Sequence, residues 1–444
     1  MKKNESYKLA GKMLAAMLLG IVTGLIFMAI RENAGVDSEL WKSLNNLLFQ
    51  DITAEGANSA LGLFYLGGQL FIRSLQVIIV PMVFTSIVIA INEIKEASML
   101  GRIAGKTIGW FLVTSFAALI MAAVVGLICY HAGLFATTVQ GLEGSTGSTG
   151  ANPLCIILNI IPSNAVAAFS VNNGVLAIVF LAVLVGLSMN KLSYGAEAVI
   201  YKGCKELSDI IVVALNYIVN KFGPIAIFML LSRTFATYGI TYLKPAFAYV
   251  VLCVLLLLVF LFIGYPLILA FATKMNPVYF VKKIFKVIVF GFSTSSSAAT
   301  LPLNIDTNIK ELGVDKQIAS FVLPLGMTIN MDGTAIMQVI ATLFIAGCSG
   351  FDISILKLVI IMLLALIASA GTPAAPGAGA VILFTILSGV GITSESAMIA
   401  YALILAINRP IEMLVTALNC VGDSVVCIVV AKSENKLDAE TYSK

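Results

Sequence analysis

Long apolar stretches recur along the 444-residue chain, and they limit its fold more than any other feature. About 20 consecutive apolar residues form a helix long enough to cross the hydrocarbon core of a bilayer. Hydrophobic residues make up 59% of the chain and charged residues only 11%, whereas about a quarter of a typical globular chain is charged. The sequence therefore predicts an all-α integral membrane protein.

The stretches that can span a bilayer, some with an interruption, predict the transmembrane helices. They cover residues 8–30, 61–91, 107–131, 153–189, 207–231, 245–273, 318–345 and 397–431. The first stretch has no small-residue cleavage site, so we expect it to be retained. Lysine and arginine concentrate in alternate loops, which predicts a multi-pass protein of the cell membrane with both termini in the cytoplasm.

Two further apolar segments are interrupted by small polar residues. The first, 287–303, contains Ser293–Ser297, and the second, 355–387, contains the Gly-, Pro- and Ala-rich run 371–379. Their apolar runs are too short for a hydrocarbon core of about 30 Å. We therefore expect two re-entrant hairpins that enter from opposite sides, an arrangement typical of inverted repeats with a binding site at the membrane midplane.

The run Asn330–Thr334 interrupts the apolar stretch 318–345 with polar residues. A carboxylate such as Asp332 costs about 2.5 kcal/mol or more at the centre of a membrane helix unless polar groups surround it. Gly333 is expected to loosen the helix, so that backbone carbonyls join Asp332 and Asn330 around a cation. Non-helical backbone at this depth is tolerated where it lines a protein cavity.

The last apolar stretch carries a polar face. Glu412, Thr416, Asn419 and Asp423 are spaced by 4, 3 and 4 residues, which places them on one side of a helix. Asn419 and Asp423 can supply oxygen ligands to a hard monovalent cation. The hydroxyls and free N–H groups at 295–297 suit an anion at a helix start. Together these pockets indicate a zwitterion or carboxylate carried with Na⁺.

Composition argues against other classes of function. The seven cysteines show no CxxC spacing and His131 is the single histidine, so a metal framework or histidine catalysis is not expected. Lysine and arginine form no stripe that would bind nucleic acid. An intramembrane aspartyl protease built on Asp332 and Asp423 is a remote alternative, because neither residue lies in a Gly-x-Gly-Asp context. We expect no enzyme activity.

Four motifs in the same order resemble the dicarboxylate/amino acid:cation symporter family, which includes glutamate transporters and neutral amino acid exchangers. They are residues 294–302, 330–334 and 371–379, and Asn419 with Gly422–Asp423. The resemblance implies a homotrimer with eight transmembrane helices and two re-entrant hairpins per chain. It also implies an elevator mechanism, in which a mobile transport domain carries an amino acid and cations past a fixed scaffold.

The resemblance also implies domain boundaries. Residues 1–7 would be a cytoplasmic N-terminus, 8–91 scaffold helices 1 and 2, 102–131 transport-domain helix 3, 153–231 scaffold helices 4 and 5, 245–431 the rest of the transport domain, and 432–444 a cytoplasmic tail. The segment 245–431 would hold helix 6, hairpin 287–303, helix 7, hairpin 355–387 and helix 8.

Substrate-binding residues are carried over from the same resemblance. Ser297 and the backbone of Ser295 and Ser296 would hold the substrate α-carboxylate, and Ala375 and Gly379 would close over the substrate. The amino and carboxylate ends of the substrate would face Glu412, Thr416 and Asn419, with Thr334 near its side chain.

Three sodium sites follow in the same way. The first would use Gly326, Asn330, Asn419 and Asp423. The second would use Thr328 with the backbones of Ser369, Ala370 and Thr372. The third, deeper site would use Asp332 and Asn330 with Thr114 and Ser115. This site departs from archetypal members, because Phe111 stands where they carry an aromatic hydroxyl.

Specificity is the point at which the sequence departs most from the acidic amino acid carriers. They place an arginine four residues before the asparagine that corresponds to Asn419, and this chain has Val415 there. Some archaeal members instead have an arginine at the position of Ser295. A buried side-chain carboxylate would then stay unpaired, which favours a neutral amino acid. A dicarboxylate, acidic amino acid or cystine symporter coupled to Na⁺ or H⁺ is the alternative. Arg409 would then swing toward the acidic substrate, although we expect it to lie on another face of the helix.

Overall fold

The computed structural model of the chain describes residues 3–54, 57–98, 101–136, 161–170, 175–192, 198–239, 243–370, 372 and 378–443. These residues form helices and connecting loops, and their one isolated β-bridge joins Val314 to Leu437. The first-half helices are α1 (Lys3–Ala34), α2 (Glu39–Leu44), η1 (Asn45–Phe49), α3 (Leu63–Ser98), α4 (Arg102–His131), α6 (Ala165–Ser170), α7 (Val175–Lys191), α8 (Val199–Tyr217), η4 (Ile218–Phe222) and α9 (Gly223–Tyr238).

The helices of the second half are shorter and more often interrupted. They are α10 (Leu243–Val259), η6 (Phe260–Gly264), α11 (Tyr265–Thr273), α12 (Pro277–Thr294), α13 (Ser297–Lys310), α14 (Lys316–Ile329), α15 (Asp332–Ser349), α16 (Ile355–Ala370), α17 (Ala378–Val390), α18 (Glu395–Ile407), α19 (Arg409–Ser433) and α20 (Ala439–Ser443). Three elements, η1, η4 and η6, are π-helical turns.

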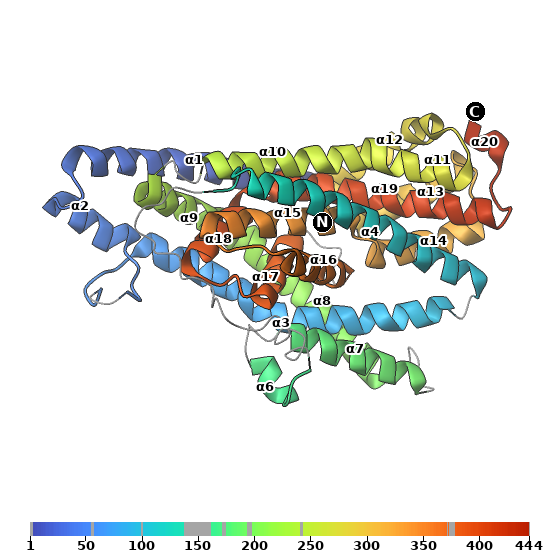
Figure 1. Cartoon of the computed structure of the whole chain (residues 1–444), viewed down its shortest axis with the longest axis horizontal. Helices are drawn as coiled ribbons and strands as arrows, with labels where there is room; N and C mark the ends of the chain where they lie inside the picture. Colours follow the sequence, from blue (N-terminus) through green and yellow to red (C-terminus); the bar gives the residue numbers. More distant parts are fainter. Residues whose placement is uncertain are drawn as a thin grey trace.

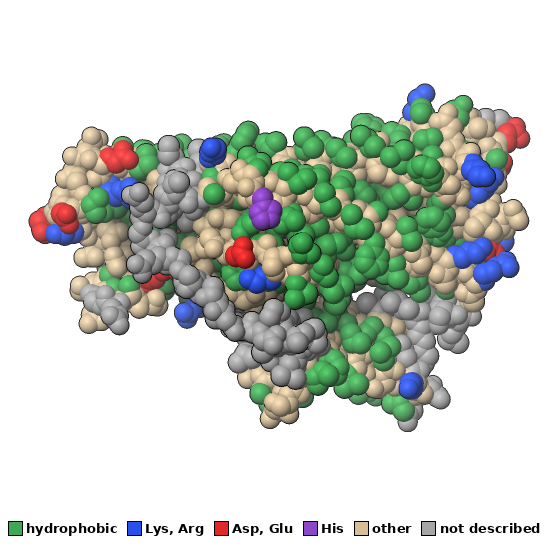
Figure 2. Space-filling model, in the orientation of Figure 1, with side chains coloured by type: hydrophobic (Ala, Val, Ile, Leu, Met, Phe, Trp, Pro, Cys, Tyr) green, Lys and Arg blue, Asp and Glu red, His purple; other side chains and the backbone are tan. Residues whose placement is uncertain are grey.

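The described residues include seven helical segments long and apolar enough to cross a membrane. Figure 2 shows hydrophobic side chains over the middle of the molecule and most charged side chains toward its two ends. This distribution is the one that a bilayer imposes on a spanning protein, and the prediction of an all-α membrane protein is confirmed. The expected span 153–189 lies partly outside the described residues, which hold α6 and α7 of this region.

The first interrupted segment forms a helix–turn–helix. Its arms α12 and α13 pack against each other, and Ser295 turns the chain with a left-handed φ of 49°. The Ser296 side chain then caps α13 by accepting the N–H of Ala299 at 3.3 Å. The first arm begins at Pro277, earlier than the expected residue 287, because Asn276 caps it. In the second interrupted segment α16 packs against α17, while residues 371 and 373–377 lie outside the described part.

Two helices break where polar residues meet the apolar core. Asn330 and Met331 separate α14 from α15 and have extended or irregular backbone angles. The break was expected, but the prediction that Gly333 causes it is wrong, since Gly333 lies inside α15. The expected continuous helix 397–431 is also wrong. It breaks at Asn408, because Pro410 lacks an N–H and its ring clashes with a preceding helical turn.

Helices α15 and α19 form the centre of the molecule (Figure 1), and nearly all their side chains are buried. Around them pack α4, α10, α12, α14, α17 and α18. The helices α1, α3, α7, α8 and α9 pack mainly against one another, and in Figure 1 α3 and α7 lie along one long side. The polar breaks are therefore surrounded by protein, which is the condition for irregular backbone at membrane depth.

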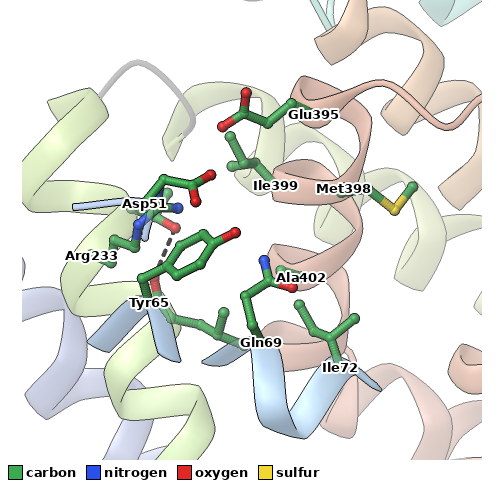
Figure 3. A pocket seen from close by; sticks show the side chains of 11 residues that line it. Asp51, Tyr65, Gln69, Ile72, Arg233, Glu395, Met398, Ile399 and Ala402 are labelled. Atoms are coloured by element: carbon green, nitrogen blue, oxygen red, sulfur yellow. Dashed lines mark hydrogen bonds between the residues drawn. The ribbon is translucent and has the colours of Figure 1, made fainter. Parts of the chain in front are cut away.

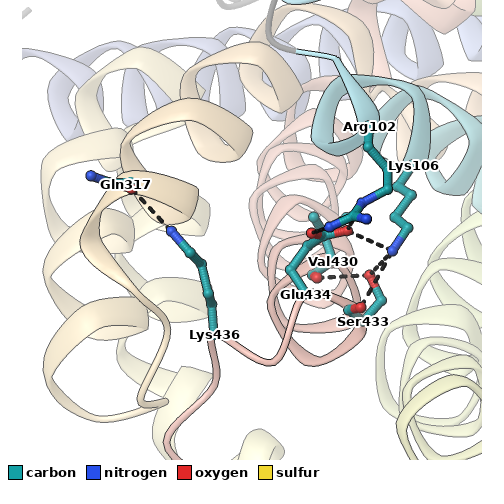
Figure 4. A network of polar contacts seen from close by, with 7 residues as sticks. All are labelled: Arg102, Lys106, Gln317, Val430, Ser433, Glu434 and Lys436. Carbon is teal, nitrogen blue, oxygen red and sulfur yellow. Dashed lines mark hydrogen bonds and ion pairs between the residues drawn. The ribbon is translucent and has the colours of Figure 1, made fainter.

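The C-terminal residues after α19 pack onto the helix ends instead of leaving the body of the protein. Glu434 accepts hydrogen bonds from Arg102 and Lys106 of α4 (Figure 4). The ammonium group of Lys283 donates to the carbonyls of Glu311, Thr441 and Tyr442 at 2.8, 2.7 and 2.8 Å. These contacts fix the chain end to α4 and to both arms of the α12–α13 hairpin.

Candidate functional site

The carboxylate of Asp332 lies at the start of α15, fully buried. It accepts a hydrogen bond from the Ser115 hydroxyl at 2.5 Å and one from the Tyr265 hydroxyl at 2.9 Å. Burying a carboxylate is costly unless hydrogen bonds and an opposite charge compensate for it. Both partners are neutral hydroxyls, so they satisfy oxygen lone pairs and leave the negative charge for a mobile cation.

Tyr265 is a site residue that the sequence analysis missed. Phe111, the position that lacks the expected aromatic hydroxyl, is buried, and its ring edge lies 2.8 Å from where a Cβ on Gly326 would stand. The hydroxyl comes instead from α11. A signal existed, because Tyr265 is a polar aromatic residue inside the apolar stretch 245–273. Thr114 is buried on α4, and its hydroxyl donates to the Phe111 carbonyl at 3.0 Å.

The first predicted sodium set comes together at the break between α14 and α15. The amide nitrogen of Asn330 donates to Asp423 Oδ1 at 3.0 Å and to the Asn419 carbonyl at 3.3 Å. Gly326 approaches so closely that a Cβ there would lie 2.5 Å from Asp423 Oδ1. The side-chain oxygen of Asn330 is buried and has no hydrogen-bond partner within the described ranges.

These residues fit a small hard cation. Such ions prefer carboxylate, amide and backbone oxygens, and Asp423 and Asn330 provide the first two types beside a loosened helix end. A buried acceptor without a partner, such as Asn330 Oδ1, costs about 1–3 kcal/mol. A bound cation would remove that cost.

The second predicted sodium set is only partly assembled. Helices α14 and α16 contact each other, but the hydroxyls of Thr328, Ser369 and Thr372 donate to carbonyls of their own local segments at 2.9, 3.0 and 2.8 Å. Ala370 ends α16 and is half-buried. The Thr372 N–H donates to the Ser369 carbonyl at 2.9 Å, but among the described residues no hydrogen bond joins Thr328 to the other three.

The predicted substrate residues come from four parts of the fold: the α12–α13 turn, α15, α17 and α19. At the α12–α13 turn, Ser295 and Ser297 are buried, and the Ser295 hydroxyl has no hydrogen-bond partner in the described part of the chain. A Cβ on Gly379 would lie 3.3 Å from Thr334 Cγ2, so α17 faces the start of α15. Ala375 lies outside the described residues. The hydroxyl of Thr416 donates to the Glu412 carbonyl of its own helix at 3.0 Å.

Asn419 lies between the cation residues and the substrate residues. Its side-chain oxygen accepts the Gly333 N–H at 2.8 Å, and its amide nitrogen reaches Thr334 Oγ1 at 3.4 Å. Val415 is buried one turn earlier, and its Cα would lie 3.2 Å from a Cβ on Gly333. A side chain at position 333 would therefore require α19 to move by a few tenths of an ångström.

A second polar cluster was also missed. Ser424 donates to Asn304 Oδ1 at 2.6 Å, and Asn308 Nδ2 donates to Ser424 Oγ at 2.9 Å. Asn304 Nδ2 also donates to the Cys420 carbonyl at 2.9 Å. These contacts fasten α13 to α19 beside Asp423. The spacing of Asn304 and Asn308 by one helical turn was the available sequence signal.

A separate cavity of about 50 Å³ lies between α3, α9 and α18 (Figure 3). Asp51 and Arg233 line it from one side and Glu395 from the other, and Arg233 lies 4.8 Å above the Tyr65 ring. None of the predicted substrate or sodium residues lines this cavity. It is therefore distinct from the site at the helix breaks.

Comparisons with known proteins agree with this arrangement. The family model for the sodium:dicarboxylate symporter family matches residues 9–433. The proton/glutamate-aspartate symporter of Escherichia coli (strain K12) is 29% identical over 98% of this chain and 95% of its own length. The proton/sodium-glutamate symport protein of Bacillus caldotenax is 28% identical over 84% and 88%. The C4-dicarboxylate transport protein of Polynucleobacter asymbioticus is 29% identical over 90% and 91%.

These matches decide between the classes of function considered above. The protease alternative is excluded, because family members are symporters and not enzymes. The prediction of a neutral substrate gains no support from relatives named for glutamate, aspartate and C4-dicarboxylates. The chain belongs to the sodium:dicarboxylate symporter family and is a multi-pass, cation-coupled membrane symporter of a small molecule.

Proposed function

We propose that the protein transports an acidic amino acid or a C4-dicarboxylate together with Na⁺. The observation that carries this proposal is a pair of buried carboxylates, Asp332 and Asp423, at the helix break where Asn330 Oδ1 has no hydrogen-bond partner among the described residues. Oxygen ligands of this type suit a hard cation. The substrate class is supported by the relatives, whose names specify glutamate, aspartate and C4-dicarboxylates.

Proton coupling is the alternative for the driving ion, because the Escherichia coli relative is named a proton symporter. The unpartnered Asn330 Oδ1 favours Na⁺, since an amide oxygen can bind a metal cation but does not accept a proton at ordinary pH. The proteoliposome test is therefore uptake of labelled glutamate, aspartate and succinate under an inward Na⁺ gradient, with choline in its place, and under a proton gradient. Uptake that persists with choline and a proton gradient would show that H⁺, and not Na⁺, is the coupling ion.

The transport movement is part of the same proposal. The group α1, α3, α7, α8 and α9 would form a fixed scaffold and a homotrimer, while the helices around α15 and α19 would move as an elevator. Both chain ends would lie in the cytoplasm. The packing of each group mainly within itself supports this division. A cysteine crosslink between α9 and α18, which contact each other here, should stop uptake if the two groups slide.

A neutral amino acid is the second candidate, and Val415 favours it. This side chain is buried against the start of α15 and brings no charge to the pocket. Uptake of labelled serine, alanine and leucine, compared with uptake of labelled aspartate and succinate, separates the candidates. Uptake of the neutral amino acids without uptake of aspartate or succinate would favour the neutral substrate.

A further inference from the structure

The guanidinium group of Arg409 lies buried at the start of α19, 7% exposed. Its Nη1 atom lies 3.5 Å from Glu412 Oε2, at the outer limit of a hydrogen bond. Its Nε and Nη2 atoms, and Glu412 Oε1, are buried and have no hydrogen-bond partner among the residues that the structure describes. An arginine keeps its charge in any protein environment. The pair therefore leaves two charged donors and one charged acceptor unsatisfied.

The two free nitrogens define the geometry of what could bind. Nε and Nη2 form one edge of the guanidinium plane, and a carboxylate binds such an edge through two parallel hydrogen bonds. The same chain provides the example. Arg102 uses its Nε and Nη2 atoms to bind both carboxylate oxygens of Glu434, at 3.1 and 2.6 Å (Figure 4). In Arg409 no carboxylate of the described residues binds the equivalent edge.

Contacts of the neighbouring residue place the start of α19, from which Arg409 extends, close to the predicted substrate residues. Asn408 donates to the Met337 sulfur at 3.6 Å. The Met337 methyl group would lie 3.1 Å from a Cβ on Gly379, and Thr334 lies against the same point at 3.3 Å. Arg409 therefore begins beside the residues that line the substrate pocket, one helical turn before Glu412.

We infer that Arg409 binds a carboxylate group of the substrate, replacing the arginine that is absent at Val415. The inference rests on the proposed acidic substrate and names the residue that selects it. Glu412 Oε2 contacts Nη1 of Arg409, and Glu412 Oε1 would accept the substrate ammonium group. An acidic amino acid satisfies both orphaned groups, whereas a C4-dicarboxylate satisfies only the arginine. We therefore expect aspartate or glutamate to bind more tightly than succinate.

The test measures uptake and competition in proteoliposomes for the unmodified protein, Arg409→Gln and Arg409→Lys. Two lost hydrogen bonds to a charged group should weaken aspartate binding by about 10- to 100-fold in both variants, because lysine lacks the planar pair of N–H groups. Competition by serine should change by less than about twofold. Arg102→Lys is the matched control and should leave selectivity unchanged. Adding Val415→Arg to Arg409→Gln should restore aspartate binding.

The outcomes separate this inference from the proposed function. Aspartate uptake that is normal in both Arg409 variants would overturn the role of Arg409 and leave the acidic substrate standing. Uptake of neutral amino acids alone by the unmodified protein would overturn both. Should Arg409→Gln fail to fold, Arg409→Lys keeps the buried charge and decides the question. Equal loss of serine and aspartate binding in that variant would mean a structural ion pair and no selection.

Discussion

The side-chain oxygen of Asn419 accepts the backbone N–H of Gly333 at 2.8 Å. A helix leaves its first N–H groups without partners in its own ladder, and at membrane depth no water is present to satisfy them. A side chain of α19 thus completes the first turn of α15. This hydrogen bond stabilises the start of α15 and joins the predicted substrate face of α19 to the predicted cation residues around Asn330.

Replacing Asn419 by alanine should destabilise the protein by about 1–3 kcal/mol, the usual cost of leaving a buried N–H without a partner. The melting temperature in detergent should fall, and Na⁺ should raise it less than in the unmodified protein. Asn216→Ala is the control, because Asn216 is half-buried and donates only to a carbonyl of its own helix. An equal loss in the two variants would contradict the role assigned to Asn419.

Replacing Tyr265 by phenylalanine should expose the unpaired charge of Asp332. The variant loses a hydrogen bond to a buried carboxylate, worth about 1.5–3 kcal/mol, so the protein without Na⁺ should melt at a lower temperature. Added Na⁺ should then stabilise the variant more than the unmodified protein, because the cation compensates a less satisfied carboxylate. Thermal melting across a Na⁺ titration measures both effects.

Tyr249→Phe provides the matched control for that experiment. Tyr249 is also fully buried, and its hydroxyl donates to the neutral Asn408 Oδ1 at 2.7 Å. Its loss should lower the melting temperature without changing the increment from Na⁺. If the two tyrosine variants respond to Na⁺ alike, the Tyr265 hydroxyl does not belong to the cation site.

The sequence predicted those parts of the site that show as polar residues inside apolar stretches. Asp332, Asn419 and Asp423 stand out because a charge or an amide is costly in hydrocarbon, so such residues usually have a function. The Ser295 turn could be found for the same reason. The break at Asn408 had a local signal, Pro410, which was overlooked in favour of one uninterrupted helix.

Other features depend on contacts between distant segments and have no local signature. Tyr265 reaches Asp332 from 67 positions away, and Ser424 bonds to Asn304 from 120 positions away. Nor does helical spacing show which atoms of Arg409 stay free, because that depends on how Glu412 and the surrounding helices pack. Arg409 was expected to lie on another face than the substrate residues, but its Nη1 atom lies 3.5 Å from Glu412 Oε2, three residues later on the helix.

The contact of Glu434 with α4 predicts a response to acid. Hydrogen bonds from Arg102 and then Lys106 lower the pKa of Glu434 to about 2. A carboxyl with a lowered pKa stabilises the folded state above its ordinary value of 4.5, and this contribution is lost as the pH falls through about 2. Glu434→Gln should therefore melt at a lower temperature than the unmodified protein at about pH 7. The difference in melting temperature between the two proteins should shrink as the pH falls below 4.5.

A matched control is Glu311→Gln, which removes a carboxylate that pairs with Lys286 on the surface. Exposed pairs contribute little to stability, so this variant should melt near the unmodified protein at every pH. Melting curves of the three proteins across the acid range test the expectation. A constant difference between Glu434→Gln and the unmodified protein at all pH values would mean that ionisation of Glu434 plays no part.

Replacing Asp423 by asparagine keeps the size of the side chain and removes its charge from beside Gly326 and Asn330. If Asp423 binds the coupling cation, the stabilisation by Na⁺ should fall, and so should the stabilisation by substrate added in Na⁺, because two linked ligands change each other's affinity by the same factor. Saturating Na⁺ at about 100 times its dissociation constant stabilises a protein by about 2.7 kcal/mol, so the loss is measurable by thermal melting.

The control for this variant is Asp352→Asn, since Asp352 is exposed and follows the C-terminal end of α15, opposite the break at Asn330 and Met331. It should keep the full response to Na⁺ and to substrate. In choline without Na⁺, the melting temperatures of the unmodified protein and of Asp423→Asn should differ only by the direct effect of the substitution on stability. Asp423→Asn with an unchanged Na⁺ titration would place the coupling cation elsewhere, with Asp332 as the remaining buried carboxylate next to the break.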